Sequence, residues 1–314
     1  MSPPQVSIIL PTRNRAYVLR QTLDGLRAQT FSDWELIVIN DGSTDGTREM
    51  VASYQDPRFI YVQNEASLGA AKARNIGLAR AQAEFIAFQD AGDDWLPEKL
   101  ALQVERLHAS SGEVGMVYTS EILVYQDGTR KAAHAPTFRP GDADTYRRAL
   151  SLEVLGIDLP ACLFRSSALK KCGGFDEELG RWIDLELFMR LAKTYRFDHV
   201  EGLLTLSYER PEGITKNVDA LVAAHARILT KYARDLSPEQ RVAHRRIVGR
   251  RLLGSSRWAG AGRSMLLEVL RAPGATASDC LWLALSAGGP GLHRLVRFLR
   301  DRLRRLCPSA FGGF

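Results

Sequence analysis

Short apolar runs alternate with segments of helical periodicity in the N-terminal part of the chain. The runs that we expect to be buried strands are 6–10, 36–39, 59–62 and 85–88. The segments with apolar residues at helical spacing are 18–26, 47–54 and 70–80. This alternation predicts an α/β fold with a mostly parallel, Rossmann-like central sheet and helices on both faces.

The pattern changes after this part. The sequence predicts a helix near 98–109, a hairpin over 116–131 that turns on Asp127-Gly128, and a helix that carries Asp184. Beyond residue 217 the pattern is helical throughout. We therefore expect one domain over 1–216, with halves of about 1–100 and 101–216, and a helical C-terminal extension over 217–314.

Polar residues follow the predicted strands, at the edge of a parallel sheet where ligands bind. Asp90 and Asp93 flank Gly92 after the fourth strand and could converge on one divalent cation, which takes oxygen ligands. The same residues could instead form a polar turn before the next helix. Asp41 could contact a nucleotide base or ribose, or could form an Asx turn or helix cap. We expect Asp45 to be structural.

Composition and the absence of targeting signals add few constraints on the fold. The four cysteines are widely spaced and form no CxxC pair, which is typical of reduced thiols in a cytoplasmic protein. The N-terminus lacks the basic and apolar regions of a secretory signal, and no apolar stretch reaches the roughly 18 residues that a membrane span needs. We therefore expect a cytoplasmic protein.

Charge is distributed unevenly. Residues 217–314 hold 17 Lys and Arg against 6 Asp and Glu, whereas residues 1–216 hold 25 against 30. Within 292–306, leucines at spacings of three and four form an apolar stripe between arginines. This pattern predicts a basic helix that attaches peripherally to an anionic membrane, or one that packs on the N-terminal domain. No motif for nucleic-acid binding accompanies the charge.

Four segments, in order and at their observed spacing, resemble the glycosyltransferase family 2 catalytic domain with its GT-A fold. They are VSIILPTRNR, ELIVINDGSTDGT, LGAAKARNIGLARAQAEFIAFQDAGDDWLPEKL and FRSSALKKCGGFDEEL. The resemblance covers about residues 5–215. It implies a nucleotide-diphosphate sugar donor, in particular a UDP-sugar, a Mn²⁺ or Mg²⁺ cofactor, and inversion at the anomeric carbon.

The resemblance also implies roles for individual residues. Asp184 matches the catalytic base, and Arg210 and Thr215 match a loop that contacts the diphosphate. The nucleotide site would comprise Pro11, Thr12, Arg13, Arg15, Asp41, Arg74 and Asp90. The metal site would comprise Asp90, Asp93 and Asp94.

Three positions depart from the family pattern. Gly92 stands where a second metal-binding aspartate is common, Ile183 replaces a glutamate before Asp184, and Pro211 lies near the place of a histidine. A Gln-x-x-Arg-Trp segment is missing, which indicates a non-processive enzyme. Asp184 can also cap its helix, and burial beside apolar neighbours should raise its pKa toward that of a useful base.

The sequence therefore predicts a metal-dependent hexosyltransferase that acts on a glycan or lipid-linked acceptor in surface polysaccharide or glycolipid synthesis. One alternative is a sugar-phosphate nucleotidyltransferase, although the segment 11–15 lacks the glycine-rich loop of that class. Another is a catalytically silent homologue that binds nucleotide or membrane, which the changes at Gly92 and Ile183 would permit. The sugar, the acceptor and the linkage have no readable signal.

Overall fold

The computed structural model describes residues 3–142, 144–210 and 217–286. Its internal contacts divide the chain into two compact units. The first comprises Met1–Ala149 and Glu153–Gly213, and the second comprises Leu150–Leu152 and Ile214–Phe314. The second unit thus begins close to the domain boundary that the change of pattern at residue 217 predicts.

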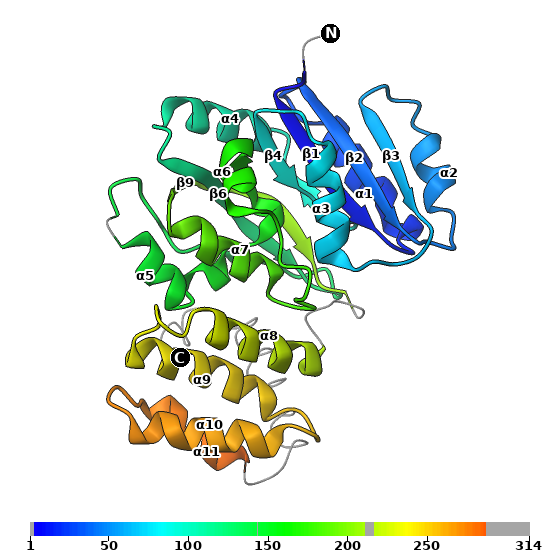
Figure 1. The fold of residues 1–314 in the computed structure, drawn as a ribbon. Helices are drawn as coiled ribbons and strands as arrows, with labels where there is room; N and C mark the ends of the chain where they lie inside the picture. The colour runs from blue at the N-terminus through cyan, green and yellow to red at the C-terminus, as the bar shows by residue number, and fades with distance from the viewer. Residues whose placement is uncertain (1–2, 143, 211–216, 287–314) are drawn as a thin grey trace. The chain divides into compact units, whose positions relative to one another are not determined.

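The first unit is built on one sheet (Figure 1). Its strands are β1 (Val6–Thr12), β2 (Trp34–Asp41), β3 (Phe59–Asn64), β4 (Phe85–Phe88), β5 (Asp94–Trp95), β6 (Val114–Val124), β7 (Arg130–Ala133), β8 (Cys162–Arg165) and β9 (Arg196–Tyr208). They lie in the order β3-β2-β1-β4-β8-β6-β9-β5, and β7 pairs with β6. Strands β3, β2, β1 and β4 are parallel to one another.

The sheet becomes mixed beyond β4. Strand β8 is antiparallel to both β4 and β6, whereas β9 runs parallel to β6. In the turn between β6 and β7, the N–H of Tyr125 donates to the carbonyl of Thr129, and the N–H of Gly128, whose φ is 81°, donates to the carbonyl of Tyr125. The predicted α/β fold with a mostly parallel central sheet is confirmed, and the antiparallel β8 links the two halves of the sheet.

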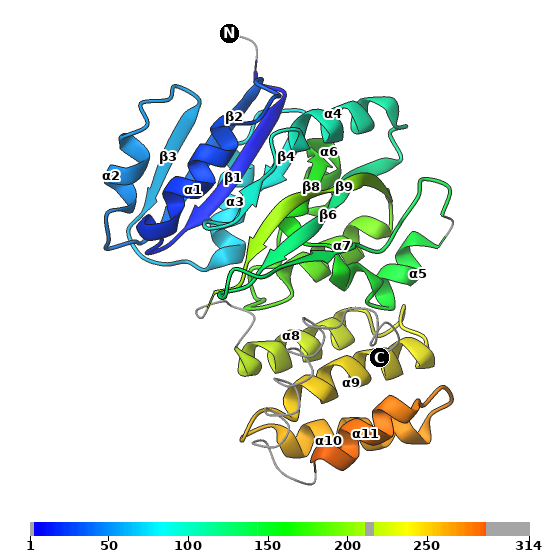
Figure 2. The same cartoon turned by 180° about the vertical axis from the view of Figure 1, so that it is seen from behind.

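Helices cover both faces of the sheet. They are α1 (Ala16–Arg27), α2 (Thr47–Ala52), α3 (Ala70–Arg80), α4 (Lys99–Ala109), α5 (Thr145–Leu150), α6 (Ser166–Cys172) and α7 (Ile183–Ala192), with short 3-10 turns η1 (Glu153–Gly156) and η2 (Leu159–Ala161). Figures 1 and 2 show α3, α6 and α7 over one face, and α1 and α4 over the other. Alternate residues of β1 therefore face different helices, which explains its unbroken apolar sequence.

The two faces have separate apolar cores. On one, Ile8 of β1 packs in a cluster with Leu23 of α1 and Val104 of α4. On the other, the rings of Phe88, Phe164 and Phe188 connect β4, β8 and α7. These cores fix the carboxyl ends of the strands, where the polar residues follow.

The second unit is helical in the part that the structure describes. Its helices are α8 (Val218–Lys231), α9 (Pro238–Leu252), α10 (Ala259–Arg271) and α11 (Ala277–Ser286). A capping box of Ser237 and Gln240 starts α9, and the buried Asp279 pairs with Arg246 and Arg250. The predicted basic helix at 292–306 lies outside the described residues. Among the described helices, none is long and apolar enough to cross a membrane.

The close approach of α3 to β1 depends on Gly77. A Cβ added there would overlap the Ile9 side chain. We expect Gly77→Ala to lower the free energy of unfolding by about 1–3 kcal/mol, because over-packing outweighs the helix propensity that alanine adds. Denaturant unfolding followed by circular dichroism measures this change.

Gly112→Ala is the matched control, because a Cβ at Gly112 would meet nothing within 4 Å. This variant should be as stable as the wild type or slightly more so. Equal stability of the two variants would contradict the tight packing of α3 on β1.

Candidate functional site

The loops after β1 and β2 interlock at one edge of the sheet. The backbone N–H of Asn14 donates to Ser43 Oγ over 2.9 Å, and the Asn14 side chain accepts from the N–H of Thr44 over 2.8 Å. Asp45 accepts from the N–H groups of Ala16 and Thr47 and so starts both following helices. These loops hold the first predicted nucleotide contacts.

The predicted contacts from β1 differ in exposure. Thr12 is buried, and its hydroxyl has no hydrogen-bond partner within the described residues. Pro11 and Arg15 are half-buried, Arg13 is exposed, and Arg15 donates to the hydroxyl of Tyr17. A buried hydroxyl that lacks a partner is costly unless a ligand or water satisfies it, so Thr12 is the position that points most directly to a ligand.

Asp41 at the end of β2 holds the loop that precedes α3. Its carboxylate accepts from the side chains of Asn64 and Ser67 and from the N–H groups of Leu68 and Gly69, over 2.7–3.0 Å. Burial acts to raise the pKa of Asp41, but these hydrogen bonds lower it further than burial raises it. Asp41 is therefore ionised at neutral pH and fixes the loop between β3 and α3.

Arg74 and Asp90 form the central ion pair of the edge. Arg74 is only 5% exposed, and its guanidinium lies 2.5 Å from Asp90 Oδ1. The residue pattern of α3 does not predict this burial, because a basic residue on a helix of mixed charge is ordinarily solvated. The ion pair connects α3 with the loop after β4.

Two neighbouring side chains form hydrogen bonds with the backbone of the loop Asp90–Asp94. Thr22 of α1 accepts from the N–H of Gly92 over 2.8 Å and donates to the carbonyl of Asp93 over 2.9 Å. Gln89 donates to the same carbonyl over 2.9 Å. The loop is thus held in one conformation by two side chains that the sequence analysis did not single out.

Asp93 and Asp94 lie in different environments. Asp94 accepts from the N–H of Trp95 over 2.8 Å, and a Cβ on Gly25 of α1 would overlap its carboxylate. Asp93 accepts from the N–H of Tyr208 over 3.0 Å. The structure therefore brings Asp93 together with Asp90 and directs Asp94 toward α1.

The Asp93 carboxyl is electrostatically crowded. Burial, and then the negative charge of Asp90, raise its pKa to about 7, although the Tyr208 N–H and the charge of Arg210 oppose them. Arg210 also donates to the carbonyl of Gly92 over 2.6 Å. The residue predicted beside it, Thr215, lies outside the described part of the chain.

Asp184 faces the same edge from the first turn of α7. The expectation that it caps the helix is wrong, because Trp182 is the N-cap and has a φ of 59°. The Asp184 carboxylate accepts from the N–H of Leu185 over 2.7 Å. Burial raises its pKa, while the charge of Arg74 lowers it and that of Asp90 raises it. These interactions join Asp184 to the ion pair of Arg74 and Asp90.

A further pair of carboxyl groups lies close to these residues. Glu121 near the end of β6 shares a hydrogen bond with Asp158, the residue that caps η2. Burial raises the pKa of both groups, and the charges of Asp93 and Asp184 raise that of Asp158 further. One proton shared by the two carboxyl groups relieves their repulsion.

The sequence analysis missed this pair, although each member has a sequence signal. Glu121 is a charged residue within an otherwise apolar strand, and Asp158 stands between Ile157 and Leu159 in a short apolar segment. A charge in such a context is uncommon unless it is paired. Their proximity depends on η2 lying beside β6, which local patterns do not report.

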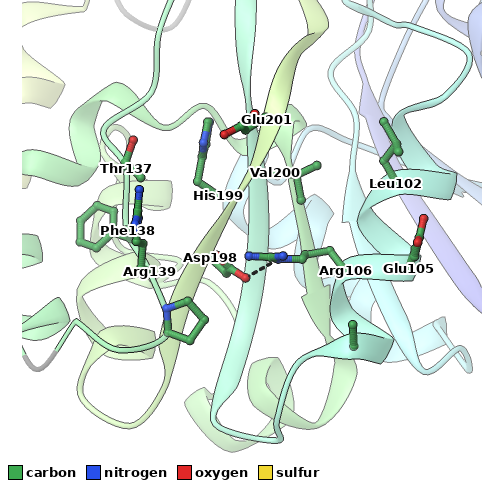
Figure 3. A pocket seen from close by; sticks show the side chains of 12 residues that line it. Leu102, Glu105, Arg106, Thr137, Phe138, Arg139, Asp198, His199, Val200 and Glu201 are labelled. Carbon is green, nitrogen blue, oxygen red and sulfur yellow. Dashed lines mark hydrogen bonds and ion pairs between the residues drawn. The ribbon is translucent and has the colours of Figure 1, made fainter.

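A separate hollow of about 630 Å³ opens between α4, the segment 137–140 and β9 (Figure 3). Two of its charged residues pair with each other, since Arg106 lies 2.5 Å from Asp198. None of the predicted site residues lines it. The hollow is therefore distinct from the edge where the carboxylates gather.

Sequence comparison places the chain among glycosyltransferases. A model described as glycosyl transferase family 2 matches residues 7–173. A Bacillus subtilis protein named as the teichuronic acid biosynthesis glycosyltransferase TuaG is 37% identical over 49% of this chain and 60% of its own length. The Escherichia coli β-1,3-glucosyltransferase WfgD, named as acting with UDP-Glc, is 39% identical over 32% of this chain and 40% of its own length. The chain thus spans about half the length of these two relatives.

Solved structures share the fold. Residues 1–349 of Staphylococcus aureus TarS, in complex with UDP-GlcNAc, align with a TM-score of 0.56 and 21% identity over 85% of this chain and 71% of that one. The Pyrobaculum calidifontis mannosyltransferase PcManGT, in complex with GDP-Man and Mn²⁺, aligns with a TM-score of 0.59 and 20% identity over 98% of this chain and 89% of that one. At such identities the likeness concerns the GT-A fold. Because the family model covers more than half of the sequence, the chain belongs to glycosyl transferase family 2.

Proposed function

We propose that this protein is an inverting, non-processive glycosyltransferase that moves a sugar from a nucleotide-diphosphate donor to an acceptor hydroxyl. One observation carries the proposal. The ion pair of Arg74 and Asp90, the half-buried Asp93 and the carboxyl of Asp184 gather at the carboxyl edge of the parallel strands. In a family 2 chain, this edge supplies both a charged end for the donor and a base for the acceptor.

The nucleoside would lie against β1 and β2. The unpartnered hydroxyl of Thr12 is available to it, and Pro11, Arg13 and Arg15 surround the same loop. The carboxylate of Asp41 already accepts four hydrogen bonds from the loop after β3, so its first role is to shape the base-binding wall. A donor that reached Asp41 directly would have to share these hydrogen bonds.

Asp90 and Asp93 are the residues that would hold Mn²⁺ or Mg²⁺. Within the described ranges, no group of three His, Cys, Asp or Glu could hold a metal alone. Two carboxylates nevertheless fit a cation that is bound jointly with substrate phosphates, as is usual for Mg²⁺. When bound, the cation would neutralise charge on the departing diphosphate.

Asp184 would act as the catalytic base. As the acceptor oxygen attacks the anomeric carbon, the bond from that carbon to the diphosphate breaks, its electrons leave with the diphosphate, and Asp184 takes the acceptor proton. Attack from the face opposite the leaving group inverts the anomeric configuration. Burial raises the pKa of Asp184, which strengthens it as a base, and Arg74 limits the shift.

We propose a UDP-sugar as the donor and a glycan or lipid-linked acceptor of surface polysaccharide or glycolipid synthesis. The names of TuaG and WfgD support this assignment, because both act in bacterial glycan assembly and WfgD is named with UDP-Glc. The arginine-rich, amphipathic sequence of 292–306 supports peripheral attachment of the C-terminal region, over 217–314, to the cytoplasmic face of an anionic membrane.

Asp41→Asn tests the shaping of the nucleotide wall. The amide cannot accept from every donor of the loop, so the free energy of unfolding should fall by about 1–3 kcal/mol at pH 7. Hydrogen bonding depresses the pKa of Asp41 in the folded state, so its stabilisation is present above the unfolded pKa of about 3.9 and is lost as pH falls through the lower folded value. The deficit of the variant should therefore shrink below about pH 4.

Denaturant unfolding from pH 3 to pH 8 measures this dependence. Asp33→Asn, at an exposed aspartate of the same unit, should match the wild type throughout. A deficit in Asp41→Asn that stayed constant down to pH 3 would show that the charge of Asp41 does not stabilise the loop.

Asp184→Asn tests the catalytic base. With the full chain, Mn²⁺ and a panel of UDP- and GDP-sugars, we expect the wild type to release nucleoside diphosphate in the presence of acceptor. The variant should lose about a thousandfold in turnover, whereas its affinity for UDP should stay within about twofold. Chromatography of the released nucleotide and calorimetric titration of UDP measure the two quantities.

Asp144→Asn, at an exposed aspartate, is the control and should leave both quantities unchanged. Wild-type turnover in Asp184→Asn would remove Asp184 from the role of base. A wild type that bound no nucleotide would instead refute the proposed function as a whole.

A further inference from the structure

The guanidinium of Arg210 occupies the space beside Gly92. A Cβ built on Gly92 would lie 2.6 Å from both Nε and Nη2 of Arg210. The φ of Gly92 is 107°, a conformation that residues with a side chain rarely adopt. The observed position of the Arg210 guanidinium therefore depends on the glycine at position 92, because a side chain there would displace the guanidinium.

Arg210 is fixed by one strong contact. Its Nη2 donates to the carbonyl of Gly92 over 2.6 Å, and its guanidinium carbon lies 5.7 Å from the centre of the Tyr208 ring. The neighbouring N–H of Tyr208 donates to Asp93, so the end of β9 and the loop after β4 hold each other. Among the described residues no carboxylate lies within ion-pair distance of Arg210, so its positive charge faces the edge without direct neutralisation.

The loop lies between two guanidiniums. Asp90 and Asp93 contribute two carboxylates, Arg74 pairs with Asp90 over 2.5 Å, and Arg210 donates to the carbonyl of Gly92, which lies between the two aspartates in the sequence. A divalent cation at this loop would meet two guanidiniums as well as two carboxylates. A diphosphate would meet two guanidiniums, which bind phosphate oxygens with paired, charge-assisted hydrogen bonds.

We infer that Arg210, seated over Gly92, is a built-in cation that replaces much of the divalent metal at the diphosphate end of the site, so that nucleoside diphosphate binds without added metal. The inference rests on the proposed function and extends it. It explains why a carboxylate that would serve a metal is missing at position 92, since the same space holds a fixed positive charge. A metal ion held by Asp90 and Asp93 would then have only an auxiliary role.

Calorimetric titration of UDP and GDP into the full chain, with Mn²⁺ and again with excess EDTA, tests the inference. Removing the metal should weaken binding of the preferred nucleotide to the wild type by less than about fivefold. Arg210→Gln should weaken binding by about ten- to a hundredfold in EDTA, because a charge-assisted contact to phosphate is lost. With Mn²⁺ the loss should be several times smaller, because the cation compensates for the missing charge.

Two further variants make the test specific. Arg210→Lys keeps the charge without the planar fork and should retain part of the binding in EDTA. Gly92→Ala should push the guanidinium away and produce the same need for metal as Arg210→Gln. Arg130→Gln, at an exposed arginine on β7, is the control and should bind as the wild type does in both conditions. Thermal unfolding verifies that each variant is folded.

The outcomes are distinguishable. Loss of wild-type binding in EDTA would overturn the inference and leave the proposed function standing. An equal loss in Arg210→Gln with and without Mn²⁺ would also overturn it, because Arg210 would then contact the diphosphate without replacing metal. Failure of the wild type to bind either nucleotide even with Mn²⁺ would refute the proposed function and the inference together.

Discussion

The ion pair between Arg74 and Asp90 is the interaction on which the edge of the sheet depends. The guanidinium of Arg74, on α3, is buried, and its positive charge acts on Asp184 as well as on Asp90. Carboxyl groups from the loop after β4, from β6, from the cap of η2 and from α7 meet here. Their mutual repulsion would be costly in a buried setting without a cation. Arg74 therefore offsets part of the negative charge that four segments of the chain bring to a single edge.

The same crowding gives the carboxyl groups distinct chemistry. Asp41 is surrounded by donors and has a lowered pKa, whereas burial raises the pKa of Asp93 and Asp184. A carboxylate with a lowered pKa is a stable structural anion, whereas one with a raised pKa accepts a proton more readily. The aspartates of the site thus form two groups. Asp41 shapes the nucleotide side, whereas Asp93 and Asp184 serve the reacting side.

Much of this arrangement could be predicted from the sequence. The strand positions follow from apolar runs that are buried on both faces, and the parallel order places Thr12, Asp41 and Asp90 at one edge. The burial of Arg74 could not be predicted in this way, because helical periodicity makes a charged residue solvated by default. The family resemblance assigns Arg74 to the nucleotide site, but it does not indicate that the side chain is buried.

Contacts within the mixed half of the sheet could not be predicted from local sequence patterns. Glu121 and Asp158 meet because η2 lies beside β6, and no turn signal specifies that. Asp94 follows Asp93 directly, yet successive residues in extended backbone point to opposite sides, and Asp94 begins the short strand β5. A count of acidic residues after β4 therefore overestimates the number that can share one ligand.

Gly92 shows why a departure from a family pattern has to be interpreted together with its spatial neighbours. By itself, the loss of a carboxylate indicates a weaker metal site or a catalytically silent homologue. In the structure the vacated volume holds the guanidinium of Arg210, which comes from the far end of β9. A glycine cannot contribute charge, but it removes the steric barrier to a cation from elsewhere. The charge balance of the site is therefore a property of two distant loops together, and neither loop reveals it alone.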